Sequence, residues 1–280
     1  MKLREKGYGT FAVTTDDKFN RLPPNNATSL RLNNLSGKLV GIRNRHSVNV
    51  LEDFESGYDN WTVRDGTFEK FGGLEIQETN SPQLQGRVVT QLPTIAKESI
   101  IEISFRVITG GLKIGFFDTV ERSDLITGGV SGTTVLFNPD GSIGTSAPST
   151  STATWVEDKV YRLAIELHPD TEQFTADLFL DGERQNIGQG LDTTNDSGGG
   201  GGIINPAENF QLCIEGDNVV IDELLLLKKE AYPHEMLANG SSYTFPCQRA
   251  IDEYEIVNLG SDARNFSDNT ESITLTGFYQ

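Results

Sequence analysis

The residues with the greatest potential for chemistry in this chain are its carboxylates, since Asp and Glu supply 40 of its 280 residues. Two carboxylates that face each other across a sugar chain can hydrolyse it, and a retaining enzyme holds them about 5–5.5 Å apart. On one strand this requires acidic residues at alternate positions. Asp222 and Glu223 are adjacent and should point to opposite faces, while Glu102 stands alone in its segment. The sequence therefore predicts no catalytic residues and a protein that is not an enzyme.

Other sites with recognisable spacing are absent from the sequence. His46, His168 and His234 are too widely separated to show the spacing of a metal site. The glycine-rich residues 197–202 lack the Lys-Ser/Thr of a phosphate-binding loop, so we expect them to form a flexible loop. There is also no Gly-x-Ser-x-Gly motif of a hydrolase nucleophile.

Aromatic residues could serve as platforms on which sugar rings stack. Trp61 and Trp155 are candidates, but both lie where a β-sandwich usually buries an aromatic side chain, and we predict that they pack in the core. Phe116 and Phe117 are adjacent on a predicted strand, so one should face the core and the other the opposite surface of the sheet.

The charge of the chain limits its partners. A net charge of −17 predicts repulsion from phosphate backbones, which argues against nucleic-acid binding, and it disfavours anionic membranes for the same reason. The N-terminus shows no apolar signal segment and no stretch is long enough for a membrane helix, so we expect synthesis in a cytoplasm and no membrane insertion. Cys213 and Cys247 are predicted to be buried free thiols.

The elements that must position these residues are short strands. Abundant Gly, Thr, Ser, Asn and Asp favour strands joined by many turns. Residues 52–230 are expected to form a jelly-roll β-sandwich, and their strand patterns fall at residues 100–107, 112–117, 133–137, 160–167, 175–180, 210–214 and 219–227.

The two ends of the chain have strand patterns of their own. Residues 34–37 are predicted to be the turn between strands at 29–32 and 38–43. A weak echo relates residues 27–32 to 240–245, which suggests related strand pairs at the two ends. We therefore expect residues 1–51 and 231–280 to form one small split β-domain, into which the jelly roll is inserted.

Several segments of the middle region resemble the concanavalin A-like lectin/laminin-G superfamily. They cover nearly two thirds of the chain in the order expected for that fold. The segments are 51–57 (LEDFESG) followed by Trp61, 138–143 (NPDGSI), Trp155 with 161–165 (YRLAI), 177–182 (DLFLDG) and 220–224 (VIDEL). The resemblance implies a jelly roll that binds carbohydrate.

The same resemblance implies a structural calcium ion. In similar carbohydrate-binding jelly rolls the first and last strands lie together, and their carboxylates help to hold Ca²⁺. Asp53, Glu55 and Asp222 stand at the matching positions, and hard oxygen ligands of this kind suit calcium. They do not form a complete ligand set, and ordinary surface carboxylates are the alternative.

The flanking regions resemble accessory proteins of tailed-bacteriophage virions in their architecture, with short strands such as residues 255–258 (EIVN). This implies a capsid decoration, head-fibre or tail accessory subunit on the virion surface, made in the host bacterial cytoplasm. Its partners would be other capsid or tail proteins and glycans, and a homo-oligomer such as a trimer is expected. The alternative is a free carbohydrate-binding protein or a glycoside hydrolase of the same fold.

Overall fold

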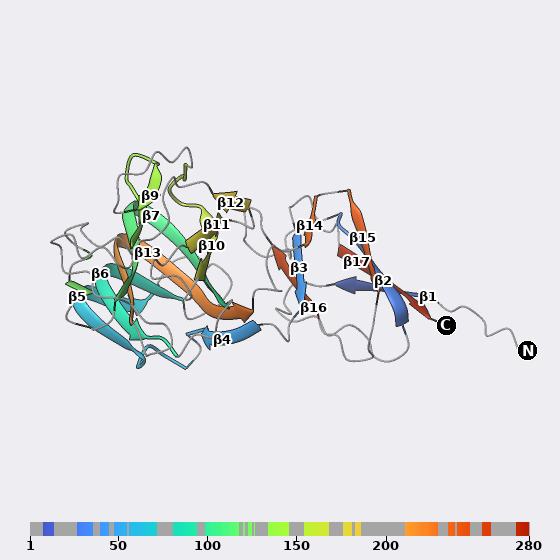
Figure 1. Ribbon diagram of the computed structural model, residues 1–280, viewed down its shortest axis with the longest axis horizontal. Coiled ribbons are helices and arrows are strands. Elements are labelled where there is room, and N and C mark those ends of the chain that lie inside the picture. Colours follow the sequence, from blue (N-terminus) through green and yellow to red (C-terminus); the bar gives the residue numbers. More distant parts are fainter. Residues whose placement is uncertain are drawn as a thin grey trace, which may run out of the picture. The chain divides into compact units, whose positions relative to one another are not determined.

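The structure is a computed structural model that divides the chain into two compact units, residues 50–229 and residues 1–49 with 230–280 (Figure 1). It contains strands and turns and, in the residues it describes, no α-helix, which confirms the all-β prediction. None of the described residues forms a helix long and apolar enough to cross a membrane. The described residues are 8–13, 27–35, 40–44, 48–54, 56–71, 81–93, 99–117, 120, 123, 124, 126, 134–145, 154–167, 176–180, 183–185, 211–228, 235–238, 240–246, 254–258 and 273–279.

The unit built from the two chain ends contains two sheets. Each sheet combines strands from both ends, so neither end can complete a sheet alone. One sheet has the order β1-β17-β2-β15, formed by β1 (Tyr8–Val13), β17 (Ile273–Tyr279), β2 (Ala27–Asn33) and β15 (Ser242–Pro246). The other has the order β14-β3-β16, formed by β14 (Glu235–Leu237), β3 (Val40–Asn44) and β16 (Tyr254–Asn258).

Strands β2 and β3 do not pair with each other, although a turn at residues 34–37 was predicted to join them. They belong to different sheets, because Asn34 exchanges backbone hydrogen bonds with the segment before β15: its N–H donates to Ser241 O and its carbonyl accepts from Gly240 N–H. The segments related by the sequence echo are partners across strands. Leu30 lies opposite Phe245.

In its described residues, the larger unit forms one bent antiparallel sheet of ten strands. Its main path has the order β12-β11-β10-β7-β13-β6-β5, with β4 paired to β13 and β8 paired to β7 and β9. The strands are β4 (Val48–Glu52), β5 (Trp61–Lys70), β6 (Pro82–Gln91), β7 (Ser99–Phe117), β8 (Thr134–Phe137), β9 (Ile143–Thr145), β10 (Val160–Leu167), β11 (Ala176–Leu180), β12 (Glu183–Gln185) and β13 (Gln211–Lys228).

A line of glycines crosses this sheet where it bends. Gly66 on β5 lies opposite Gly86 on β6, and Gly86 lies opposite Gly216 on β13. The register between β7 and β13 shifts immediately after Gly216, next to Gly110. Gly86 has φ of 121°, and a Cβ there would overlap the backbone carbonyl of Asp65, so glycine is required. The long strands β7 and β13 thus bend without ending (Figure 1).

The bend keeps the apolar side chains of both halves on one core. In β7 the core residues occupy odd positions before the glycines and even positions after them, because the bulge adds a residue there. These residues are Ile101, Ile103, Phe105, Val107, Leu112, Ile114 and Phe116. Strand β13 changes phase at the same place, between Ile214 and Val219, and a second irregularity after Ile221 shifts the phase again before Leu224. Both long strands therefore keep their apolar side chains on one hydrophobic core.

The aromatic predictions are confirmed. Trp61 and Trp155 are both buried in the main core and are therefore not sugar-stacking platforms. Phe116 belongs to the main core, whereas Phe117 lies on the other face of the sheet, in a small cluster with Val89, Ile126 and Cys213. Cys213 is a buried free thiol, as predicted, whereas Cys247 lies outside the described residues.

Candidate functional site

The face of β10, β7 and β13 that points away from the main core carries buried polar residues. Ser104 on β7 lies directly opposite Arg162 on β10 and Glu223 on β13, so these residues form one row across three strands. Glu102 lies two residues before Ser104, on the same face of β7. All four residues are buried, which places a charged row inside the protein and not on its surface.

Arg162 joins the two carboxylates of this row. Its Nη1 atom lies 3.1 Å from Oε1 of Glu102 and 3.4 Å from Oε2 of Glu223. The side chain of Arg162 is 6% exposed and that of Glu102 is fully buried. A buried charge is tolerated when an opposite charge and hydrogen bonds compensate it, so each residue depends on the others for its stability in the fold.

Glu102 is the single acidic residue of β7, as predicted, but Glu223 on the neighbouring strand shares its arginine. A search along single strands missed this pair, because the pairing of strands brings the carboxylates together. The cluster is thus suited to holding three strands together.

The proposed calcium ligands lie in different surroundings. Asp222 is fully buried on β13, and its Oδ1 accepts a hydrogen bond of 2.9 Å from Ser81 Oγ, so it is not a surface carboxylate. Asp53 follows β4, which pairs with β13, while Glu55 lies outside the described residues. Among the residues that the structure describes, no three His, Cys, Asp or Glu side chains form a metal-binding group. Because Glu55 lies outside the described residues, a calcium ion held by Asp53, Glu55 and Asp222 stays a prediction.

The residues around Asp53 have a structural role. Phe54 has a positive φ of 61°, which is unfavourable for this residue type, and its side chain is fully buried. The carboxylate of Glu52 accepts the Phe54 N–H at 3.0 Å and also a hydrogen bond from Asn60. The ring of Phe54 lies 5.9 Å from that of Trp61. The turn after β4 thus inserts an aromatic side chain into the core.

The turn between β8 and β9 is a rigid polar feature. Oδ1 of Asp140 accepts hydrogen bonds from the N–H and the hydroxyl of Ser142, and these bonds lower the pKa of the Asp140 carboxyl below its usual value. The indole of Trp155 donates to the carbonyl of Asn138 at 2.9 Å. These bonds fix residues 138–142, with Asp140 exposed at the tip.

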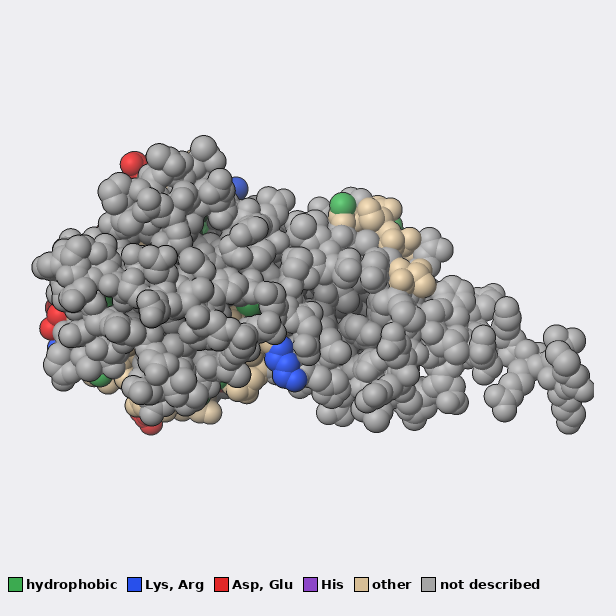
Figure 2. All heavy atoms as spheres, in the orientation of Figure 1, with side chains coloured by type: hydrophobic (Ala, Val, Ile, Leu, Met, Phe, Trp, Pro, Cys, Tyr) green, Lys and Arg blue, Asp and Glu red, His purple; other side chains and the backbone are tan. Residues whose placement is uncertain are grey.

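Among the residues whose side-chain exposure the structure describes, the exposed large apolar side chains are Leu35, Val50, Val63 and Val156, which are widely separated in the sequence. Figure 2 agrees with this, since the described surface in that view shows only small, separate hydrophobic areas. The histidines of the sequence all lie outside the described residues.

Comparisons with known proteins gave structural similarities alone. No family model and no curated protein matches the sequence. Among solved structures, the cellulose-induced protein Cip1 is 16% identical, with a TM-score of 0.39 over 62% of this chain and 95% of its own. Lectin I-B4 from Griffonia simplicifolia, in its metal-free form, is 14% identical, with a TM-score of 0.39 over 64% and 98%. The carbohydrate-binding module CBM66 from Bacillus subtilis is 11% identical, with a TM-score of 0.36 over 60% and 96%.

Proposed function

We propose that this chain is a non-enzymatic attachment protein, in which the unit formed by the chain ends docks to a larger assembly and the jelly roll is displayed to bind glycans. The observation that carries this proposal is the insertion. Both sheets of the smaller unit need strands from the two chain ends, and the whole of residues 50–229 lies between them.

The insertion is compatible with two functions in one chain. Strand β4, where the larger unit begins, pairs with β13, where it ends, so the unit starts and finishes on neighbouring strands. A domain whose ends are adjacent can be inserted into another without opening it. Substitutions on the larger unit can then alter its binding surface without altering the docking surface of the smaller unit.

The non-enzymatic part of the proposal is supported by the buried charged row. Arg162 contacts both Glu102 and Glu223, and all three side chains are buried, so both carboxylates are engaged within the protein. The alternative, a glycoside hydrolase, would require one of these glutamates to protonate a leaving group. Hydrolysis would therefore first require the arginine to move away.

Glycan binding is supported by the sequence resemblance of residues 52–230 to carbohydrate-binding jelly rolls. Since Trp61 and Trp155 are buried, binding would depend on hydrogen bonds from polar loops, such as the fixed turn at Asp140. Contacts of this kind are shallow, so the affinity of one unit should be weak and several copies would raise it. A trimer would supply such copies.

The more specific form of the proposal is a decoration, head-fibre or tail subunit of a tailed-bacteriophage virion. It is supported by the architectural resemblance of the flanking regions and by the strongly acidic chain. Capsid or tail genes beside the coding sequence would support this form. Genes for sugar uptake or polysaccharide breakdown would favour a free carbohydrate-binding protein.

A glycan panel tests binding and catalysis together. The full chain is incubated with immobilised glycans to measure retention, and with the same glycans in solution to count new reducing ends. The proposal expects retention on at least one glycan and no reducing ends. New reducing ends that disappear on Glu102→Gln or Glu223→Gln would show that the chain is a hydrolase.

A further inference from the structure

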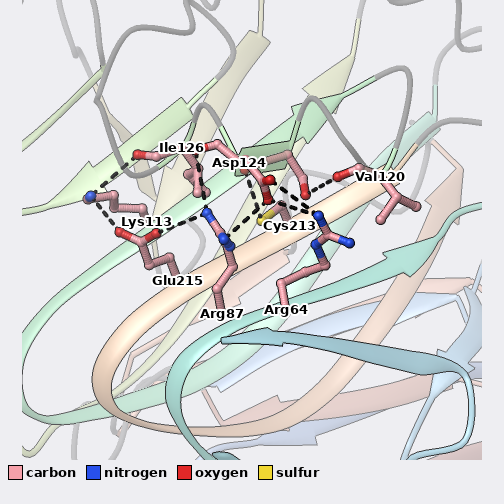
Figure 3. A network of polar contacts seen from close by, with 9 residues as sticks. Arg64, Arg87, Lys113, Val120, Asp124, Ile126, Cys213 and Glu215 are labelled. Atoms are coloured by element: carbon pink, nitrogen blue, oxygen red, sulfur yellow. Dashed lines mark hydrogen bonds and ion pairs between the residues drawn. The ribbon is translucent and has the colours of Figure 1, made fainter. Parts of the chain in front are cut away.

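A second charged cluster lies on the outer face of the other half of the sheet (Figure 3). Three cationic side chains project from this face: Arg64 from β5, Arg87 from the neighbouring β6, and Lys113 from β7, which β13 separates from β6. Glu215 on β13 lies opposite both Lys113 and Arg87 in the strand register. The carboxylate of Asp124, from the connection between β7 and β8, lies over them.

Two arginines converge on the carboxylate of Asp124. Arg64 Nη2 lies 3.3 Å from Oδ1 and 3.2 Å from Oδ2 of Asp124, and Arg87 Nη2 lies 3.2 Å from Oδ1. Lys113 forms a short ion pair of 2.6 Å with Glu215, and the other carboxylate oxygen of Glu215 lies 4.0 Å from Arg87 Nη1. These five residues therefore set three cationic side chains against two carboxylates, which leaves a surplus of positive charge in the cluster.

Asp124 is the least enclosed member of the cluster. Its side chain is 50% exposed, whereas those of Arg64 and Arg87 are 29% and 14% exposed. The arginines are thus fixed on the sheet, and the carboxylate approaches them from the solvent side on a connecting segment. Exposed ion pairs of this kind are weak, so a carboxylate from outside can compete with that of Asp124.

We infer that Arg64 and Arg87 form a binding site for the carboxylate of an acidic glycan, and that Asp124 occupies this site when no ligand is bound. Paired guanidinium groups bind carboxylates with favourable geometry and retain a positive charge at all physiological pH values. The choice of a glycan as the source of the carboxylate rests on the proposed function. The site itself rests on the geometry of the cluster.

The connection between β7 and β8, which carries Asp124, is also held to the sheet by contacts of a neighbouring residue. Lys113 Nζ donates to the carbonyl of Ile126 at 3.3 Å, and the side chain of Ile126 is fully buried in the small cluster with Phe117 and Cys213. These contacts do not involve the Asp124 carboxylate. The carboxylate can therefore leave the arginines while the segment stays anchored through Ile126.

Calorimetric titration of the full chain with short oligogalacturonides tests the inference. The titration is made at about 0.15 M salt, because the net charge of −17 would otherwise repel a polyanion over long distances. Asp124→Asn should bind about fivefold more tightly than the unaltered protein, since it removes the competing carboxylate. Adding Arg87→Gln to the Asp124→Asn variant should abolish this increase in affinity. Asp158→Asn is the matched control, because it removes an exposed carboxylate beside a different arginine, Arg106.

Further titrations distinguish a failure of this carboxylate site from a failure of the proposed glycan-binding function. Methyl-esterified oligogalacturonides should show no gain on Asp124→Asn, because the ester lacks the charge. If Asp124→Asn does not fold, Arg64→Gln should weaken binding to the otherwise unaltered chain. Equal affinity of all variants, or a gain that survives Arg87→Gln, would overturn the site while leaving neutral-glycan binding untouched. A gain reproduced in full by acetate would overturn the glycan as the source of the carboxylate.

Discussion

Arg162 and Glu102 form an ion pair in the interior of the larger unit, with Nη1 of the arginine 3.1 Å from Oε1 of the glutamate. The two residues lie on neighbouring strands, β10 and β7, on the face opposite the main core. Glu223 lies beyond β7, on β13, and its Oε2 atom is 3.4 Å from the same Nη1 atom. One cation therefore connects three adjacent strands at the centre of the sheet.

Removing the shared cation should destabilise the larger unit severely. Arg162→Met leaves two carboxylates buried without their shared cation, and we expect the free energy of unfolding to fall by about 3–5 kcal/mol. Glu102→Gln leaves Arg162 paired with Glu223, and should cost about 1–3 kcal/mol. Urea unfolding followed by tryptophan fluorescence measures this unit alone, because the only two tryptophans, Trp61 and Trp155, lie in its core. A smaller loss for Arg162→Met than for Glu102→Gln would contradict the account.

The glycines at the bend of the sheet predict a difference in stability between two alanine variants. Gly86→Ala combines a positive φ with overlap between the new Cβ and the Asp65 carbonyl, whereas Gly57→Ala has a positive φ with open space around the Cβ. We expect Gly57→Ala to cost about 1–2 kcal/mol from backbone strain. Gly86→Ala should cost at least about 2 kcal/mol more, because two strands must separate. Equal urea midpoints for the two variants would show that the close approach at Gly86 is unimportant.

Cys213 predicts a dependence of stability on pH. Burial raises the pKa of its thiol from 9.0 to about 12, so above pH 9 the unfolded chain releases this proton while the folded chain keeps it. The folded state then binds more protons, and stability falls as pH rises, by about 1.4 kcal/mol per pH unit between roughly pH 9 and 12. The measurement compares urea midpoints of the unaltered protein and Cys213→Ala at pH 8 and pH 10. The difference in urea midpoint between the two proteins isolates the effect of this thiol. If that difference were the same at pH 8 and pH 10, the thiol would have no role in the pH dependence.

Much of the larger unit could be predicted from the alternation of apolar residues. The predicted strand at residues 160–167 matches β10, and residues 175–180 contain β11. The error was to divide two long strands. Residues 100–107 and 112–117 are both parts of β7, because the glycines between them form a bulge and not a turn. Glycine interrupts the alternation of apolar residues both at a bulge and at a turn. Only the pairing with the partner strand distinguishes a bulge from a turn.

The charged residues were harder to predict than the core. The burial of Trp61 follows from its residue type and its place in a strand, and both can be read from one segment. The meeting of Glu102, Arg162 and Glu223 depends on which strands pair and in what register, which no single segment contains. Asp124 illustrates the same limit, since its two arginines lie on different strands of the sheet.

The most direct test of the attachment account is a sedimentation experiment with the two units separated. Residues 1–49 joined to 230–280 by a short Gly-Ser bridge, and residues 50–229 alone, are each mixed with virions assembled without the chain. The account predicts that the joined ends sediment with the particles and that residues 50–229 stay folded in the supernatant. Saturable sedimentation of residues 50–229, with the joined ends left in solution, would contradict it by placing the docking surface on the jelly roll.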